Sequence, residues 1–216
     1  ADALSARLET VEVGSSVQLS VARGFARFSD DVDRLKGWLA GAGVPDGVTM
    51  DADLRWIVTL QLARLGAIGA ADIDAELRRD SSSEGIVHAT RCRAALPTAE
   101  AKDRAWAQIT TDADLANYEL YAACEGFWHP AQTELTAPYV DRYFAEIAGT
   151  DKLRSGWVVA RSALLAFPRY AISEHVVDRG SDLAADESVA AGIRRSVADG
   201  VDDLKRALAV RSAFAG

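Results

Sequence analysis

The stretch that decides the fold class is residues 51–66, DADLRWIVTLQLARLG. Five apolar residues recur in it at offsets 0, 3, 4, 8 and 11: Leu54, Ile57, Val58, Leu62 and Leu65. This spacing lines one face of a helix with 3.6 residues per turn. Asp51 is suited to cap its amino-terminal end, and Gly66 is suited to end it. The stretch therefore predicts an amphipathic helix with its own start and stop signals.

Similar signals recur along the whole chain. Further helices are predicted over residues 15–28, 31–39, 72–79, 81–96, 98–109, 112–126, 130–148, 151–166, 173–189 and 190–214. Ser81 and Glu84 have the spacing of a capping box. The last range is expected to form one helix or two, because Gly192 and Gly200 weaken it. No segment alternates β-branched residues between turn signals, so strands are not expected.

Neighbouring helices are expected to pair. We predict hairpins that join 15–28 to 31–39, 51–66 to 72–79, and 81–96 to 98–109. About ten helices joined by short connections are typical of an all-α superhelical array of antiparallel helix pairs, a HEAT-like α-solenoid. Residues 1–216 would then be a single helical-repeat domain. A compact irregular helical bundle is the alternative.

Composition excludes several classes of protein. The 24 basic and 32 acidic side chains give a net charge of −8, which argues against nucleic acid as a partner. No apolar run approaches the roughly 20 residues that a membrane span requires, so no membrane partner is expected. The only two cysteines, Cys92 and Cys124, lie far apart in the sequence. They favour a reducing compartment, and hence a cytoplasmic protein. The 41 alanines, and the excess of 20 arginines over four lysines, favour helices.

Motifs for catalysis are missing. A zinc protease helix needs two histidines four residues apart with a glutamate beside the first, whereas His88, His129 and His175 are widely separated. Neither cysteine lies in a glycine-flanked nucleophile elbow. We therefore predict no catalytic, cofactor-binding or metal-ligating residue in this chain. A self-contained hydrolase that uses scattered His and Asp side chains is kept as an alternative.

The chain contains five tryptophans: Trp38, Trp56, Trp106, Trp128 and Trp157. We expect them to pack one helix pair against the next, with one or two available to line a peptide groove.

Several motifs occur in a recognisable order. They are LxxWLxG at 35–41, VPxGV at 44–48, DxDLRW at 51–56, RAAxPTAEAK at 93–102, GFW at 126–128 and APYVxxYF at 137–144. Together they resemble the C-terminal domain of actinobacterial aminopeptidase N. The resemblance runs from about residue 18 to residue 144, and beyond that only helical character continues it.

Members of that family are zinc metallopeptidases that remove N-terminal amino acids from peptides. Their metal ligands and catalytic glutamate precede this region, so the resemblance implies zinc in the parent enzyme and none in this chain. It also implies a helical domain that closes over the catalytic domain of the same polypeptide and helps to select peptide substrates by length. The chain starts at Ala1 and has Met50 as its sole methionine, which fits an excised piece.

Three arginines are candidates to face a peptide: Arg55, Arg91 and Arg93. A guanidinium can bind a peptide carboxylate through paired hydrogen bonds, although pairing with nearby Asp and Glu is the alternative for each. The predicted function is a non-catalytic C-terminal domain that is inactive alone. A free-standing helical-repeat scaffold that binds a protein partner is the alternative.

Overall fold

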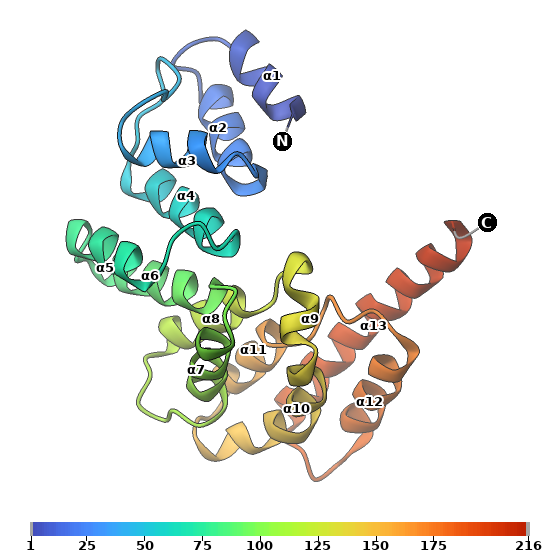
Figure 1. The fold of residues 1–216 in the computed structure, drawn as a ribbon. Helices are drawn as coiled ribbons and strands as arrows, with labels where there is room; N and C mark the ends of the chain where they lie inside the picture. The colour runs from blue at the N-terminus through green and yellow to red at the C-terminus, as the bar shows by residue number, and fades with distance from the viewer. Residues whose placement is uncertain (1, 215–216) are drawn as a thin grey trace. The chain divides into compact units, whose positions relative to one another are not determined.

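The computed structural model describes residues 2–214, and every regular element in that range is a helix (Figure 1). The expected all-α fold is confirmed. The backbone forms two compact units, Ala1–Pro97 and Thr98–Gly216. We call them the N-terminal unit and the C-terminal unit, and each is described by itself.

The described part of the N-terminal unit contains α1 (Asp2–Thr10), α2 (Ser16–Phe28), α3 (Val32–Leu39), α4 (Ala52–Arg64), α5 (Ala70–Arg79) and α6 (Ser83–Ala95). The α4 helix forms as its sequence signals predict. The Asp51 carboxylate accepts a hydrogen bond of 2.8 Å from the Leu54 backbone N–H. Gly66 follows the helix at a φ of +67°, a conformation that glycine adopts readily.

The helices of this unit pair in a different phase from the predicted one. The close partners are α1 with α2, α3 with α4, and α5 with α6. In the second of these pairs the Leu39 carbonyl, at the end of α3, accepts a hydrogen bond of 3.0 Å from Arg55 near the start of α4, so the helices are antiparallel. The predicted hairpins were wrong by one helix because α1 was not expected.

The second members of the pairs, α2, α4 and α6, stack on one another as a layer. Gln61, late in α4, donates a hydrogen bond of 2.9 Å to the carbonyl of Ser29, just past the end of α2. Trp56 in α4 and His88 in α6 stack at equivalent heights, with ring centroids 5.6 Å apart. The three helices of the layer therefore run parallel.

Two helix starts of the N-terminal unit differ from the prediction. The cap of α6 is Ser82 and not Ser81, because the Ser82 hydroxyl accepts the hydrogen bond from the Gly85 N–H at 3.1 Å. The α5 helix begins at Ala70, two residues before the expected start. Asp72 lies inside its first turn, where the carboxylate accepts a hydrogen bond of 2.9 Å from the Gly69 N–H.

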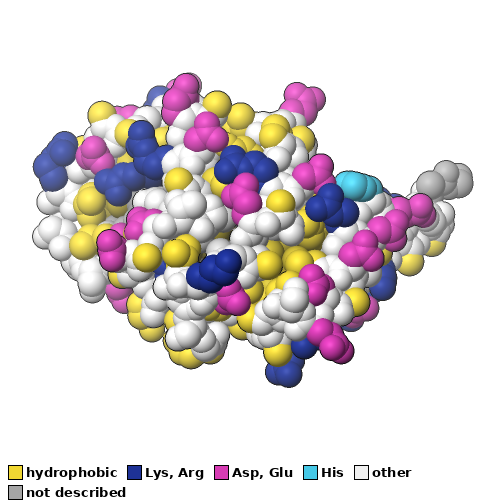
Figure 2. Space-filling view, turned by 90° about the horizontal axis from the view of Figure 1, so that it is seen from below, with side chains coloured by type: hydrophobic (Ala, Val, Ile, Leu, Met, Phe, Trp, Pro, Cys, Tyr) yellow, Lys and Arg dark blue, Asp and Glu magenta, His cyan; other side chains and the backbone are white. Residues whose placement is uncertain are grey.

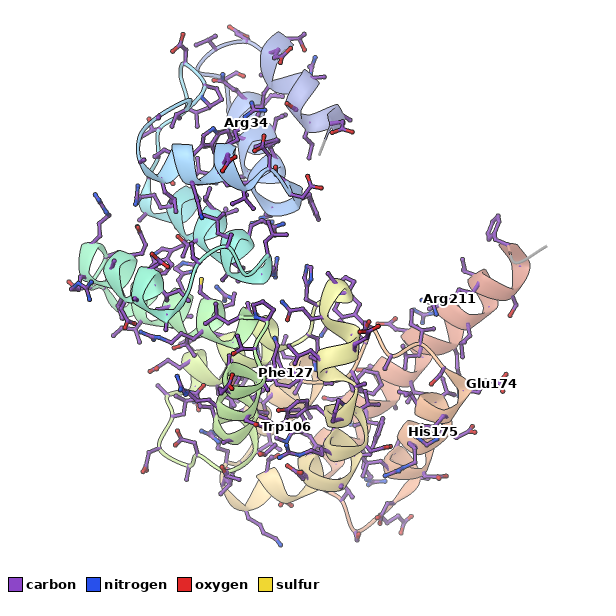
Figure 3. The ribbon with its side chains drawn as sticks, in the orientation of Figure 1. Arg34, Trp106, Phe127, Glu174, His175 and Arg211 are labelled. Carbon is purple, nitrogen blue, oxygen red and sulfur yellow. The ribbon has the colours of Figure 1, made fainter. Side chains whose placement is uncertain are left out.

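Aromatic packing organises the interior of the N-terminal unit. Trp38 is fully buried, lies 5.3 Å from the ring of Phe25, and donates its indole N–H to the Gly43 carbonyl at 2.9 Å. The Arg34 guanidinium, labelled in Figure 3, covers the Phe25 ring at 4.4 Å. The loop after α3 is thus fastened to the core by a tryptophan.

The described part of the C-terminal unit contains α7 (Ala99–Thr110), α8 (Asn117–Phe127), η1 (Pro130–Gln132), α9 (Thr133–Thr136), α10 (Pro138–Glu146), η2 (Ile147–Lys152), α11 (Trp157–Leu165), α12 (Glu174–Ala185) and α13 (Ala191–Phe214). The single helix expected over 130–148 is divided into short pieces, with Pro138 at the start of α10, where its missing N–H leaves no hydrogen bond unmade. The helix expected over 151–166 starts only at Trp157, after Gly156 at a φ of +64°.

The range 190–214, which was expected to form one helix or two, forms one helix, α13, of 24 residues. Its glycines are points of close packing and do not divide it. A Cβ on Gly200 would lie 2.7 Å from the ring of Phe167, and one on Gly192 would lie 3.2 Å from the Cβ of Ala160. Near the other end of α13, Arg211 donates to the Ile172 carbonyl just before α12, so α12 and α13 are antiparallel (Figure 3).

Here too the second helices of successive pairs form a parallel layer, made of α8, α11 and α13. At the carboxyl ends of α8 and α11, the Trp128 indole N–H donates to the Ala166 carbonyl at 2.8 Å. At their amino-terminal ends, the rings of Tyr121 and Trp157 lie 5.9 Å apart. Behind this layer, Trp106 of α7 faces Phe127 of α8 with ring centroids 5.3 Å apart (Figure 3).

Candidate functional site: an arginine-lined pocket

A pocket of the N-terminal unit lies across the parallel layer α2, α4 and α6, and has a volume of about 320 Å³. Its lining residues are Arg27, Phe28, Trp56, Ile57, Leu60, Arg64, His88, Arg91 and Cys92. The α4 residues among them lie on the face of that helix opposite to Arg55, Thr59 and Leu62, which line a second pocket together with residues of α3 and α5. The layer therefore presents an open surface with a hollow in it.

The charge of this pocket is opposite to that of the chain. Three arginines line it, and no Asp or Glu does. Arg27 and Arg64 each lie in the last turn of their helix, where the helix dipole favours a positive side chain. The face drawn in Figure 2, by contrast, shows basic side chains scattered among acidic ones. The pocket is thus a local cationic site in an acidic protein.

His88 forms a hydrogen bond with Arg91, one of the three arginines. Its Nδ1 lies 3.1 Å from Nη1 of Arg91. Burial lowers the pKa of His88, and the neighbouring charge of Arg91 lowers it further. The imidazole is therefore neutral at pH 7. Because an arginine only donates hydrogen bonds, Nδ1 is the acceptor and Nε2 carries the proton.

The floor of the pocket is an aromatic stack. His88 and Trp56 are nearly parallel, with an interplanar angle of 18°. The Trp56 indole N–H donates to the Asp80 carboxylate at 2.8 Å, and the Ser82 hydroxyl donates to the other oxygen at 2.6 Å. The hydrogen bonds from Ser82 and Trp56 lower the pKa of Asp80, so this carboxylate stays ionised and anchors the indole.

The cysteines do not supply a nucleophile. Cys92 lines the pocket but is only 1% exposed, and burial raises its pKa to about 12. Burial likewise raises the pKa of Cys124 in the C-terminal unit. Both are free thiols that stay protonated at neutral pH, whereas nucleophilic attack requires the thiolate.

The structure separates the three arginines that the sequence singled out. Only Arg91 lines the pocket. Arg55 lies on the other face of α4, where Nε and Nη2 each donate to one oxygen of Glu76 at 2.6 Å. Arg93 donates to Asp74 at 2.6 Å. Arg27 and Arg64 were missed because nothing in the sequence places the ends of α2 and α4 beside Arg91.

The histidines lie on separate elements. His88 is in α6, His129 caps η1, and His175 in the first turn of α12 contacts Asp141 at 3.2 Å. Within residues 2–214, no three His, Cys, Asp or Glu side chains are placed to hold a metal ion. The residues present therefore do not fit a zinc ion. None of the helices in this range has the length and apolar character needed to cross a membrane.

Comparison with known proteins assigns the family. Residues 14–206 match the ERAP1-like C-terminal domain. The chain belongs to this family. Aminopeptidase N of Streptomyces lividans is 34% identical over 217 residues, which cover 99% of this chain and 25% of that relative. This ERAP1-like C-terminal domain thus spans about a quarter of the length of the relative.

The match confirms the resemblance found in the sequence and extends it. The motifs ended near residue 144, whereas the ERAP1-like C-terminal domain continues to residue 206 and so includes most of α13. It also includes every residue of the arginine-lined pocket, from Arg27 to Cys92.

Proposed function

We propose that this chain is the non-catalytic C-terminal domain of a zinc-dependent aminopeptidase N that removes N-terminal amino acids from peptides. The family match and the relative of about four times the length support a longer polypeptide with a catalytic domain. Because the match runs through both compact units, we treat residues 1–216 as one helical-repeat domain. Zinc bound in the catalytic domain would activate water for peptide hydrolysis.

The proposed role of this domain is to close the chamber in which peptides are cleaved and to bind the far end of the peptide. The observation that carries this role is the pocket of Arg27, Arg64 and Arg91, which has no acidic lining residue. A carboxylate forms strong, paired hydrogen bonds with guanidinium groups. Beside them Phe28, which lines the same pocket and is 70% exposed, offers an apolar surface to the last side chain of the peptide.

The proposed role includes selection of peptides by length. A peptide binds productively at both ends only if it is long enough to reach from the catalytic centre to the pocket. His88 contributes by holding the Arg91 guanidinium in one orientation before the peptide arrives. Such preorganisation lowers the entropy lost on binding.

The test uses the aminopeptidase polypeptide that contains this chain. Peptides of one sequence are compared with a free carboxyl end and with an amide end, and KM and kcat are measured. Arg91→Gln should raise KM for the free acid about tenfold, with little change in KM for the amide. Arg93→Gln, whose side chain pairs with Asp74, is the matched control. Equal KM values for acid and amide in the unaltered enzyme would refute the carboxylate role.

The proposed location is the cytoplasm. Cys92 and Cys124 are both free and buried, in different units. Proteins of oxidising compartments commonly pair their cysteines, so two unpaired thiols favour a reducing one. Cell fractionation followed by immunodetection checks this placement.

A further inference from the structure

A second cluster of aromatic and cationic side chains lies in the C-terminal unit, at the amino-terminal ends of α8 and α11. Two of its aromatic residues are unusually exposed, Tyr118 at 71% and Trp157 at 64%. The sequence had predicted that Trp157 would pack between helix pairs. Large aromatic side chains left in water are a frequent sign of a binding surface.

Tyr121 connects these two exposed side chains. Its ring centroid is 6.2 Å from that of Tyr118, in an edge-on arrangement, and 5.9 Å from that of Trp157. The guanidinium carbon of Arg161, one turn into α11, lies 5.0 Å from the Tyr121 ring. The four side chains form one contiguous cluster that is built on two packed, parallel helices.

Two buried polar atoms, one in this cluster and one on Arg154 just before α11, have no hydrogen-bond partner. One is the hydroxyl of Tyr121, a residue that is 96% buried, and the other is Nη1 of Arg154. The second nitrogen of that guanidinium, Nη2, is fully used, donating to the carbonyls of Asp112 at 2.6 Å and Leu115 at 3.1 Å. An unpaired buried donor is destabilising, so such groups are commonly satisfied by a bound ligand or water.

The unpaired Tyr121 hydroxyl lies within the electrostatic reach of both arginines. Burial raises the pKa of Tyr121, while the charges of Arg161 and Arg154 act in the opposite direction. The phenol is therefore neutral and available as a hydrogen-bond donor, with positive charge close by. Among the described residues Arg161 has no ion-pair partner, and Glu119 in the first turn of α8 is not paired with either arginine.

The helix ends add to this positive field. Neither α8, of 11 residues, nor α11, of nine, has a side-chain hydrogen bond at its N-cap. The first N–H groups of a helix have no partner within it and favour anions. Because the two helices run parallel, both sets of N–H groups are at the end that carries the cluster.

We propose that this cluster binds an oxyanion, either a carboxylate or a phosphate, that is attached to an aromatic or aliphatic group. The Tyr121 hydroxyl donates to the oxyanion, and the guanidinium groups of Arg161 and Arg154 contribute positive charge. The apolar part of the ligand packs on Tyr118 and Trp157. This site is distinct from the arginine-lined pocket and does not depend on the peptidase role.

The experiment uses the 216-residue chain labelled with 5-fluorotryptophan and observed by fluorine NMR. The five tryptophans give one resonance each, and Trp157→Phe and Trp56→Phe assign the two that report on the two sites. The probes are 3-phenylpropionate, phenyl phosphate, the neutral 3-phenylpropionamide, acetate and inorganic phosphate. We expect the two phenyl oxyanions to bind at least tenfold more tightly than the amide, as measured by titration of the Trp157 resonance.

The relative affinity of 3-phenylpropionate and phenyl phosphate then shows which oxyanion the site prefers. Tyr121→Phe keeps the ring and removes the unpaired hydroxyl, and it should weaken binding about tenfold. Arg161→Gln should weaken it similarly, whereas Tyr170→Phe, outside the cluster, should leave it unchanged. The proposal is overturned if the amide shifts Trp157 as strongly as the acid, or if both variants bind as the unaltered chain does. A response at Trp56 alone overturns it as well, because binding is then in the arginine-lined pocket.

Discussion

Arg55 and Glu76 are joined by two hydrogen bonds of 2.6 Å each, between α4 and α5, with the Glu76 side chain only 9% exposed. The hydrogen bonds that Arg55 donates to Glu76 raise the pKa of Arg55 despite the opposing effect of burial. Arg55 therefore has a structural role, because its side chain connects α4 to α5 within the N-terminal unit.

Breaking this pair on one side should destabilise the fold strongly. We expect Glu76→Gln to lower the free energy of unfolding by about 3 kcal/mol, because the Arg55 charge is left poorly compensated. The double variant Arg55→Met, Glu76→Met should lose less than the sum of the single losses. Urea denaturation measures all three. Asp202→Asn, in the exposed pair with Arg206, is the control and should cost less than about 1 kcal/mol.

The close contact at Gly200 predicts a packing defect. Gly200→Ala places a Cβ 2.7 Å from the Phe167 ring, and should lower the free energy of unfolding by about 1–3 kcal/mol even though alanine favours helices. Gly149→Ala has open space around its Cβ and is the matched control. A thermal melt that places Gly200→Ala at or above the unaltered chain would contradict this account.

Two tyrosines should respond oppositely to loss of the hydroxyl. The Tyr143 hydroxyl donates to the Ala163 carbonyl at 2.8 Å, so Tyr143→Phe should destabilise the fold by about 1 kcal/mol. The Tyr121 hydroxyl is buried without a partner, so Tyr121→Phe should leave stability unchanged or increase it. Chemical denaturation without ligand measures both. A loss of stability in Tyr121→Phe equal to that in Tyr143→Phe would show that the hydroxyl has a partner.

His88 should make stability depend on pH. Its folded-state pKa lies below the ordinary histidine value of 6.5, so the unfolded chain binds the proton more readily. The stability that it contributes is complete above pH 6.5 and decreases as pH falls below that value. His88→Gln should therefore flatten the stability profile between about pH 7 and pH 5. Denaturation midpoints across this range, with His175→Gln as the exposed control, provide the comparison.

The sequence predicted the fold where local signals are strong. Asp51 and Gly66 bound α4 as expected because a cap and a stop glycine act within a few residues of the helix end. The α1 helix was missed, since Leu4 and Leu8 are its only large apolar residues, and two residues on one face are too few to indicate a helix. Missing that one helix changed the predicted partner of each helix after it.

The candidate site was predictable only in part. The sequence named Arg91 as able to meet a carboxylate, and Arg91 lies in the pocket. Its neighbours Arg27 and Arg64 come from two other helices of the parallel layer, and the stacking of those helices is a tertiary property. Trp157 was expected inside and is exposed, because burial of a single aromatic residue depends on what covers the helix face.

The pairing of α1 with α2, α3 with α4 and α5 with α6 determines where this chain can be shortened. A cut between α2 and α3, near Asp30, would remove one whole pair and leave the following pairs intact. A cut in the glycine-rich loop after α3 would instead separate Trp38 from the Gly43 carbonyl and leave α4 without its partner. Insertion or loss of repeats is therefore expected to have breakpoints before the odd-numbered helices of this unit.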